Sequence, residues 1–215
     1  MKEDTNLETA YVIKSVNRFL VGESFVRRGN RYLCFNEKAA FIVSFHSSGA
    51  LHCSYYVMPF FYPFQGFQMT FGDRLPVSLI SMEKRPDKQK IIQWSETFVY
   101  QYTTIIAPFF MSWKTYLEDA KRTPSKFGFC PQIDVSEFMI YYDLYREDLE
   151  QARVELTRYE ELLNKATWIH KTHVEREKKK IEQLSELIDQ GVYAVKEYIR
   201  GVIQSTKSFL KIKEL

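Results

Sequence analysis

Apolar residues follow two different patterns along the 215-residue chain. In the first part they occur in short segments separated by turn residues, and all seven prolines lie at or before Pro131. The run from there to Leu215 has no proline and carries apolar residues at helical spacing, which favours long helices. The pattern therefore predicts two regions, residues 1–131 and residues 132–215.

The first region begins with a predicted helix from about Asn6 to Leu20, where apolar residues recur at close to 3.6-residue spacing. Short segments in which apolar and polar residues alternate then predict antiparallel strands connected by the turns at Gly29-Asn30 and Ser47–Gly49. The predicted strands are Phe25–Arg28, Arg31–Asn36, Ala40–His46 and Leu51–Met58, with a short additional segment at Gln68–Phe71.

Further helices are predicted from about Asp87 to Ala107, where Pro108 is expected to stop or kink the helix, and from Trp113 to Ala120. The segment Thr123–Pro131 is expected to be a linker. The predicted fold class is α+β: an N-terminal helix, an antiparallel four-stranded or slightly larger meander sheet with packed helices, and a long C-terminal antiparallel helical hairpin.

The second region carries an unbroken heptad stripe, which is typical of a coiled coil or a helical hairpin. Its members are Val135, Phe138, Tyr142, Tyr145, Leu149, Ala152, Leu156, Tyr159, Leu163 and Ala166. Capping boxes at Asp134…Glu137 and Thr172…Glu175 predict helices at about Asp134–Ala166 and His173–Phe209. We expect these two helices to bury the stripe against each other; homodimerisation is the main alternative.

An aromatic run interrupted by Pro59, Pro63 and Gly66 separates the strands from the later helices. Proline removes donors from a strand ladder, so this run is expected to be an irregular loop over the sheet. The aromatic residues either cap the core or form a binding patch. They are Phe60, Phe61, Tyr62, Phe64 and Phe67.

Composition narrows the classes of function. The formal net charge of +3 is too small to indicate a polyanion partner, and the three cysteines form no CxxC pair that would suggest zinc. The N-terminus lacks the pattern of a secretory signal, and no apolar run is long enough to span a membrane. These features predict a cytoplasmic protein that carries no cofactor.

Candidate chemistry centres on the hairpin of residues 46–53. A second pair, His170 and His173, has helical spacing that could hold a metal but lies in the predicted break between the two C-terminal helices. His46 and His52 are weak candidates for a metal site, but no Asp or Glu in this segment supplies a further ligand. Cys53 adjoins His52 in sequence, yet neighbouring strand residues face opposite sides. An enzyme centred on this hairpin is therefore a minority hypothesis, and nucleic-acid binding through Arg27, Arg28, Arg31 and Tyr32 is another.

Four short motifs resemble an uncharacterised bacterial family, the domain of unknown function 4304. They are Gly22–Gly29, Arg31–Phe35, Phe71–Leu75 and Ile106–Phe110, within a likeness that covers about residues 7–120. The resemblance implies a helix followed by a meander and a second helix, and it implies no catalytic residues. By analogy it suggests an immunity or defence-associated role.

The leading hypothesis is a non-enzymatic protein that binds another protein through the aromatic loop, the helical region or both. The chain has many surfaces to pack and no catalytic signature such as GxGxxG, HExxH or GxSxG. A metal-dependent or Cys/His enzyme and a nucleic-acid-binding protein are the alternatives.

Overall fold

The computed structural model describes residues 14–47, 50–64, 67, 71–75, 80–81, 88–122, 132–167 and 171–212. These residues belong to two compact units, which we call the sheet unit and the helical unit. The sheet unit comprises residues of the ranges Met1–Met58 and Met69–Tyr116, and the helical unit comprises Pro59–Gln68 and Leu117–Leu215. The aromatic loop, which the sequence analysis placed over the sheet, is thus grouped with the C-terminal helices.

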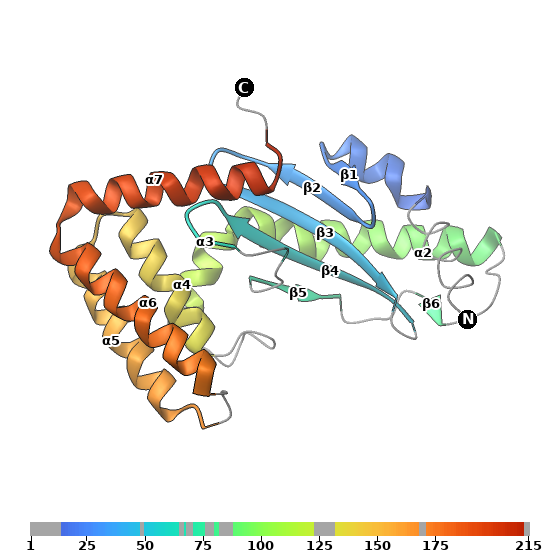
Figure 1. Ribbon diagram of the computed structural model, residues 1–215. Helices are drawn as coiled ribbons and strands as arrows, with labels where there is room; N and C mark the ends of the chain where they lie inside the picture. Colours follow the sequence, from blue (N-terminus) through green and yellow to red (C-terminus); the bar gives the residue numbers. More distant parts are fainter. Residues whose placement is uncertain are drawn as a thin grey trace. The chain divides into compact units, whose positions relative to one another are not determined.

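The fold is α+β, with an antiparallel sheet in the order β1-β2-β3-β4-β5 (Figure 1). The strands are β1 (Val26–Arg28), β2 (Arg31–Phe35), β3 (Ala39–Ser47), β4 (Ala50–Pro59), β5 (Gly72–Arg74) and β6 (Ile80–Ser81), which pairs with β4. The four predicted strands are confirmed to within two residues at each end. Gly29 has φ 63°, the positive value that this two-residue turn needs from its first residue.

One face of the sheet packs against helices of the same unit. Phe45 of β3 contacts Trp94 and Phe98 of α2 (Lys88–Gln101), with ring centroids 6.2 and 5.7 Å apart. Tyr55 of β4 contacts Phe109 at 5.2 Å. Phe41 of β3 contacts Phe110 at 5.1 Å, so the predicted placement of Phe41 and Phe45 on one face of the sheet is confirmed.

The helix after the sheet continues through Pro108 instead of ending there. α2 leads into a π-helical turn, η1 (Tyr102–Ile106), and then into α3 (Ala107–Arg122). Ala107 N–H donates to Tyr102 O, which closes a wider turn than that of an α-helix. The wider turn accommodates the ring of Pro108, which has no N–H to donate. Because of this turn, the two predicted helices form one nearly continuous helical segment.

Among the described residues after Pro131, the structure has four helices where two were expected. They are α4 (Gln132–Tyr145), α5 (Leu149–Lys165), α6 (Lys171–Asp189) and α7 (Val192–Phe209). α4 pairs with α5, α5 with α6, and α6 with α7 (Figure 1). Each predicted long helix is therefore divided in two.

Both divisions have local causes. Glu147 adopts φ 64° between α4 and α5, and the Asp148 carboxylate accepts a hydrogen bond from Gln151 N–H at 3.1 Å as the N-cap of α5. Gly191 adopts φ 89° between α6 and α7, a conformation that glycine takes without strain. Gly191, with ψ −179°, lies in a region of backbone conformation that is essentially restricted to glycine.

The predicted capping boxes are displaced. α4 begins at Gln132, so Asp134 lies inside its first turn instead of preceding it. α6 begins at Lys171, so Thr172 is already helical. Several expected features lie outside the described residues, namely the start of the first helix at Asn6, the strand segment Gln68–Thr70 and the linker Thr123–Pro131. None of the described helices is long and apolar enough to cross a bilayer.

Candidate functional site

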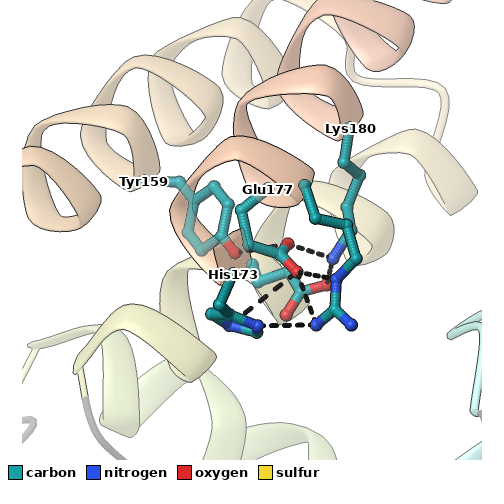
Figure 2. Close-up of polar contacts among 6 residues, drawn as sticks. Tyr159, His173, Glu177 and Lys180 are labelled. Carbon is teal, nitrogen blue, oxygen red and sulfur yellow. Dashed lines mark hydrogen bonds and ion pairs between the residues drawn. The ribbon is translucent and has the colours of Figure 1, made fainter. Parts of the chain in front are cut away.

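A polar network connects α4, α5 and α6 inside the helical unit (Figure 2). Tyr159 comes from the second half of α5, whereas His173, Glu177 and Lys180 share one face of α6 at helical spacing. The full network comprises Asp134, Glu137, Tyr159, His173, Arg176, Glu177 and Lys180.

Glu177 is the centre of this network and is only 3% exposed. Its Oε2 accepts a hydrogen bond from the Tyr159 hydroxyl at 2.9 Å and forms an ion pair with Lys180. Its Oε1 accepts from Arg176 Nη2 at 3.2 Å. Burial raises the pKa of Glu177, but hydrogen bonds and charge from Lys180, with further help from Tyr159 and His173, outweigh it, and the net shift is downward.

Lys180 extends the network to α4. Its ammonium group lies 2.8 Å from Glu137 Oε1 as well as against Glu177. Desolvation lowers the pKa of Lys180, but the two carboxylates outweigh it and the net shift is upward. Nearby positive charge offsets the burial of Asp134 only in part. Burial, together with the charges of Glu137 and Glu177, raises the pKa of the Asp134 carboxyl to about 6.

This chemistry suits structural locking better than catalysis. A general base must reach its substrate and have a pKa near the working pH. Glu177 has little exposure and a lowered pKa, and donors from two helices already engage both of its oxygens. The hydrogen bonds and ion pairs of Glu177 and Lys180 therefore hold α4 and α5 against α6.

The predicted heptad residues are buried within one chain. Val135, Phe138, Leu156, Tyr159 and Leu163 are each less than 7% exposed and Tyr142 is 8% exposed. Tyr145 and Leu149, which flank the turn between α4 and α5, are half-buried. The helix pair α4 and α5 thus covers most of the stripe, with Ser136 Oγ donating to Glu155 O across the crossing at 3.3 Å.

Most of the loop aromatics belong to the core of the helical unit. Phe61 stacks on Tyr145 with centroids 4.9 Å apart and also contacts Phe138 and Tyr142 of α4. The Tyr62 carbonyl accepts a hydrogen bond from Thr206 of α7 at 3.1 Å.

Phe60, Phe61 and Tyr62 are buried, and Phe64 and Phe67 are half-buried. The core-capping interpretation therefore fits the first three, although the core that they cap is helical. Only Phe64 and Phe67 retain partial exposure for an interaction surface.

Three exposed apolar side chains lie in the helices that adjoin the turns 146–148 and 190–191. Arg153 forms an ion pair with Asp189 at 2.5 Å, and Lys196 forms one with Glu147 at 3.0 Å, so these turns share one end of the unit. We call this end the turn surface. It exposes three large apolar side chains, Val154 at 55%, Val192 at 41% and Tyr193 at 78%. Charged residues of both signs border them.

The two hairpin histidines lie near each other, but among cations. His46 is half-buried, and its pKa is lowered by desolvation first and then by the charges of Arg31, Arg74 and His52. Arg31 pairs with Ser44 in the β2–β3 register, and Arg74 pairs with Ser54 in the β4–β5 register. Residues directly opposite in an antiparallel pair share a face, so these side chains form what we call the basic face of the sheet.

The hairpin offers little to a metal-dependent or Cys/His enzyme. The Cys53 thiol is fully buried, and desolvation raises its pKa well above the ordinary range, which disfavours the thiolate nucleophile. In the part of the chain that the structure describes, no group of three or more His, Cys, Asp or Glu residues could hold a metal ion.

Two features escaped the sequence analysis although signals for them exist. Asp148-Leu-Glu-Gln151 has the spacing of a capping box and marks the start of α5. α4 is apolar around its whole circumference, with Met139, Ile140 and Leu144 buried outside the heptad stripe, which indicates a helix enclosed on all sides. The heptad phase of the stripe, continued beyond Ala166, reaches His173, Glu177 and Lys180, which are members of the polar network.

No protein-family model, curated protein or solved structure matches this chain. The resemblance to the domain of unknown function 4304 therefore stays a prediction.

Proposed function

We propose that this is a non-enzymatic cytoplasmic protein that binds another protein through the turn surface of its helical unit. The observation that carries the proposal is the exposure of Tyr193 beside Val192, at the end of the unit that also exposes Val154. Tyrosine supplies a large contact area with two side-chain torsions and is enriched among the residues that dominate binding energy.

The surroundings of Tyr193 support the same interpretation. Interfaces commonly place apolar or aromatic residues within a polar rim. Here the rim consists of the ion pairs Arg153–Asp189 and Lys196–Glu147, whose charges remain about half exposed. Such exposed charges contribute little to folding stability and are available to a partner.

Two other parts of the chain are less suited to the role. The heptad stripe is largely buried between helices of one chain, so a homodimer through this stripe would have to open the unit. Phe60, Phe61 and Tyr62 are likewise occupied by α4 and α7. The cytoplasmic location rests on the sequence, with its three widely spaced cysteines.

A photo-crosslinking amino acid placed at position 193 tests the proposal in cells. It should capture a protein that the same amino acid at Tyr100, an exposed tyrosine of α2, does not capture. The captured protein is then purified, and its affinity is measured for the wild type, Tyr193→Ala and Tyr100→Ala. Tyr193→Ala should weaken binding by about 2 kcal/mol, or roughly thirtyfold, and Tyr100→Ala should not.

The same measurements can contradict the proposal. Equal capture from positions 193 and 100 would indicate nonspecific proximity. A purified partner that binds Tyr193→Ala as tightly as the wild type would exclude the turn surface as the binding site. Capture of a second copy of this chain, together with dimer mass by light scattering, would replace the separate partner with self-association.

A further inference from the structure

The basic face arranges polar side chains in a row across the strands of the sheet unit. Arg28 of β1 pairs with Arg31 of β2, which pairs with Ser44 of β3. On the other side of the β3–β4 hairpin, Ser54 of β4 pairs with Arg74 of β5. Because opposite residues share a face, two serines lie between arginines that come from both edges of the sheet.

Independent electrostatic contacts place the two sides of this row together. His46 of β3 is close enough to Arg31, Arg74 and His52 for each charge to act on it. Arg31 also hydrogen-bonds to the side chain of Tyr56 on β4. Arginine and histidine side chains from β2, β3, β4 and β5 therefore surround one region of this face.

Two buried hydroxyls in the same region have no partner among the described residues. Ser44 and Ser54 are both 0% exposed, and neither Oγ forms a hydrogen bond with any part of the chain that the structure describes. A buried hydroxyl without a partner is costly, so its presence needs an explanation. A hydroxyl donor beside arginines is suited to receive an oxyanion.

The charge on this face also selects the sign of a ligand. The described strand residues that share it include no Asp or Glu, because Asp73 pairs with Tyr55 and so lies on the opposite side. A metal cation placed beside His46 would be repelled by Arg31 and Arg74. An anion would be attracted by both guanidinium groups and would favour protonated histidines.

We propose that the basic face binds a small phosphate-bearing ligand, with its oxyanion between Arg31 and Arg74 and in hydrogen-bond reach of the Ser44 and Ser54 hydroxyls. A phosphate group presents three terminal oxygens in a tetrahedral array. These oxygens can accept hydrogen bonds from Arg31 and Arg74 on opposite sides of the two serines. A carboxylate presents two oxygens in one plane and satisfies fewer of these donors. The ligand enters at the rim, where Arg74 is exposed and His46 and His52 are half-buried.

Titration of the full-length protein with inorganic phosphate tests this site. The ¹H–¹³C NMR signal of the His46 ring is followed against pH, with and without phosphate, and chloride keeps the ionic strength constant. Phosphate should raise the pKa of His46, because an adjacent anion stabilises the imidazolium. Acetate at the same concentration should raise it less, which separates phosphate from carboxylate recognition.

Variants on both sides of the sheet make the test specific. Arg74→Ala should weaken phosphate affinity at least about tenfold, since it removes charge-assisted hydrogen bonds. Arg27→Ala is the matched control, because Arg27 pairs with Tyr32 on the opposite face and its Nε donates to Gly29 O. The Ser44→Ala, Ser54→Ala double variant should fold and should also lose phosphate affinity.

Three results would overturn the proposal. They are an unchanged His46 titration in millimolar phosphate, an equal loss of affinity in Arg27→Ala and Arg74→Ala, and full affinity in the serine double variant. The site lies in the sheet unit and uses no residue of the turn surface. Its failure would therefore leave the protein-binding proposal untouched, and the reverse also holds.

Discussion

At the scale of single residues, Asp134 stands out because folding changes its proton affinity. Burial raises the pKa of its carboxyl from an ordinary 3.8 to about 6. The folded protein then binds a proton that the unfolded chain releases between these values. The contribution of Asp134 to the free energy of unfolding is therefore favourable at low pH and declines as pH rises from about 4 to about 6.

Asp134→Asn tests this linkage. The amide cannot ionise, so the variant should be more stable than the wild type by about 1 kcal/mol at pH 7.5, and the difference should disappear near pH 4. Urea unfolding at the two pH values measures it. Asp119→Asn, at an exposed position of α3, is the control and should have a small effect at both. A stabilisation of Asp134→Asn that is independent of pH would contradict the linkage.

Sequence patterns predicted the burial of apolar residues in the helical unit better than the burial of polar residues. Phe138, Leu156 and Leu163 follow from heptad spacing, because burial of an apolar side chain depends mainly on its place in the repeat. Glu177 belongs to the same class of exposed-looking charges as its neighbours Lys178 and Lys179 in sequence. Lys180 connects Glu177 to Glu137 of α4, which lies 43 residues before Lys180, and local spacing does not identify a partner at that distance in the sequence.

At the scale of elements, the two glycines of the last helical segment have opposite roles. Gly191 has φ 89° and forms the junction of α6 and α7, whereas Gly201 is helical within α7. A Cβ added at either position would meet no atom within 4 Å. Backbone conformation alone should therefore decide the effect of a methyl group.

Gly201→Ala should raise the free energy of unfolding by about 1 kcal/mol, because alanine loses less backbone entropy in a helix. Gly191→Ala should lower it by about 1–2 kcal/mol, because its φ is strained for an L-residue. Chemical denaturation of both variants beside the wild type measures the contrast. Equal effects of the same sign would show that the two positions do not differ in conformation as described.

The division between α4 and α5 illustrates why the predicted hairpin of two helices became four helices. The stripe keeps its three- and four-residue spacing through Tyr145 and Leu149, on either side of the turn. One long helix with a buried face has apolar residues at three- and four-residue spacing. Two shorter helices that pack this face against each other have the same spacing. Whether one helix or two form depends on the left-handed conformation of Glu147. A non-glycine residue gives no sequence signal for this conformation.

At the scale of the whole molecule, the chain is not divided at one point in sequence. Strand alternation correctly predicted most of the sheet, but the aromatic loop that follows β4 packs in the helical unit. Aromatic composition predicts that a segment is buried, but it does not predict which helix or strand the segment packs against. The contacts of Phe61 with α4 join residues more than 70 positions apart, beyond the reach of local patterns.

Phe61→Ala tests this assignment. Loss of its contacts with Phe138, Tyr142 and Tyr145 should cost about 3–5 kcal/mol, and hydrogen exchange should accelerate in α4 and α5. Phe64→Ala, at a half-buried position of the same loop, is the matched control and should have a smaller effect. Faster exchange confined to β3 and β4 would assign the loop to the sheet.

The position of this loop also has a consequence for biosynthesis. A ribosome releases Phe60, Phe61 and Tyr62 before it has made α4, which begins at Gln132, and long before α7, which ends at Phe209. At ordinary elongation rates the aromatic side chains wait on the order of ten seconds for the helices that cover them. During that interval the nascent chain exposes apolar aromatic surface, which is prone to aggregation, and synthesis stopped before Gln132 leaves this surface uncovered.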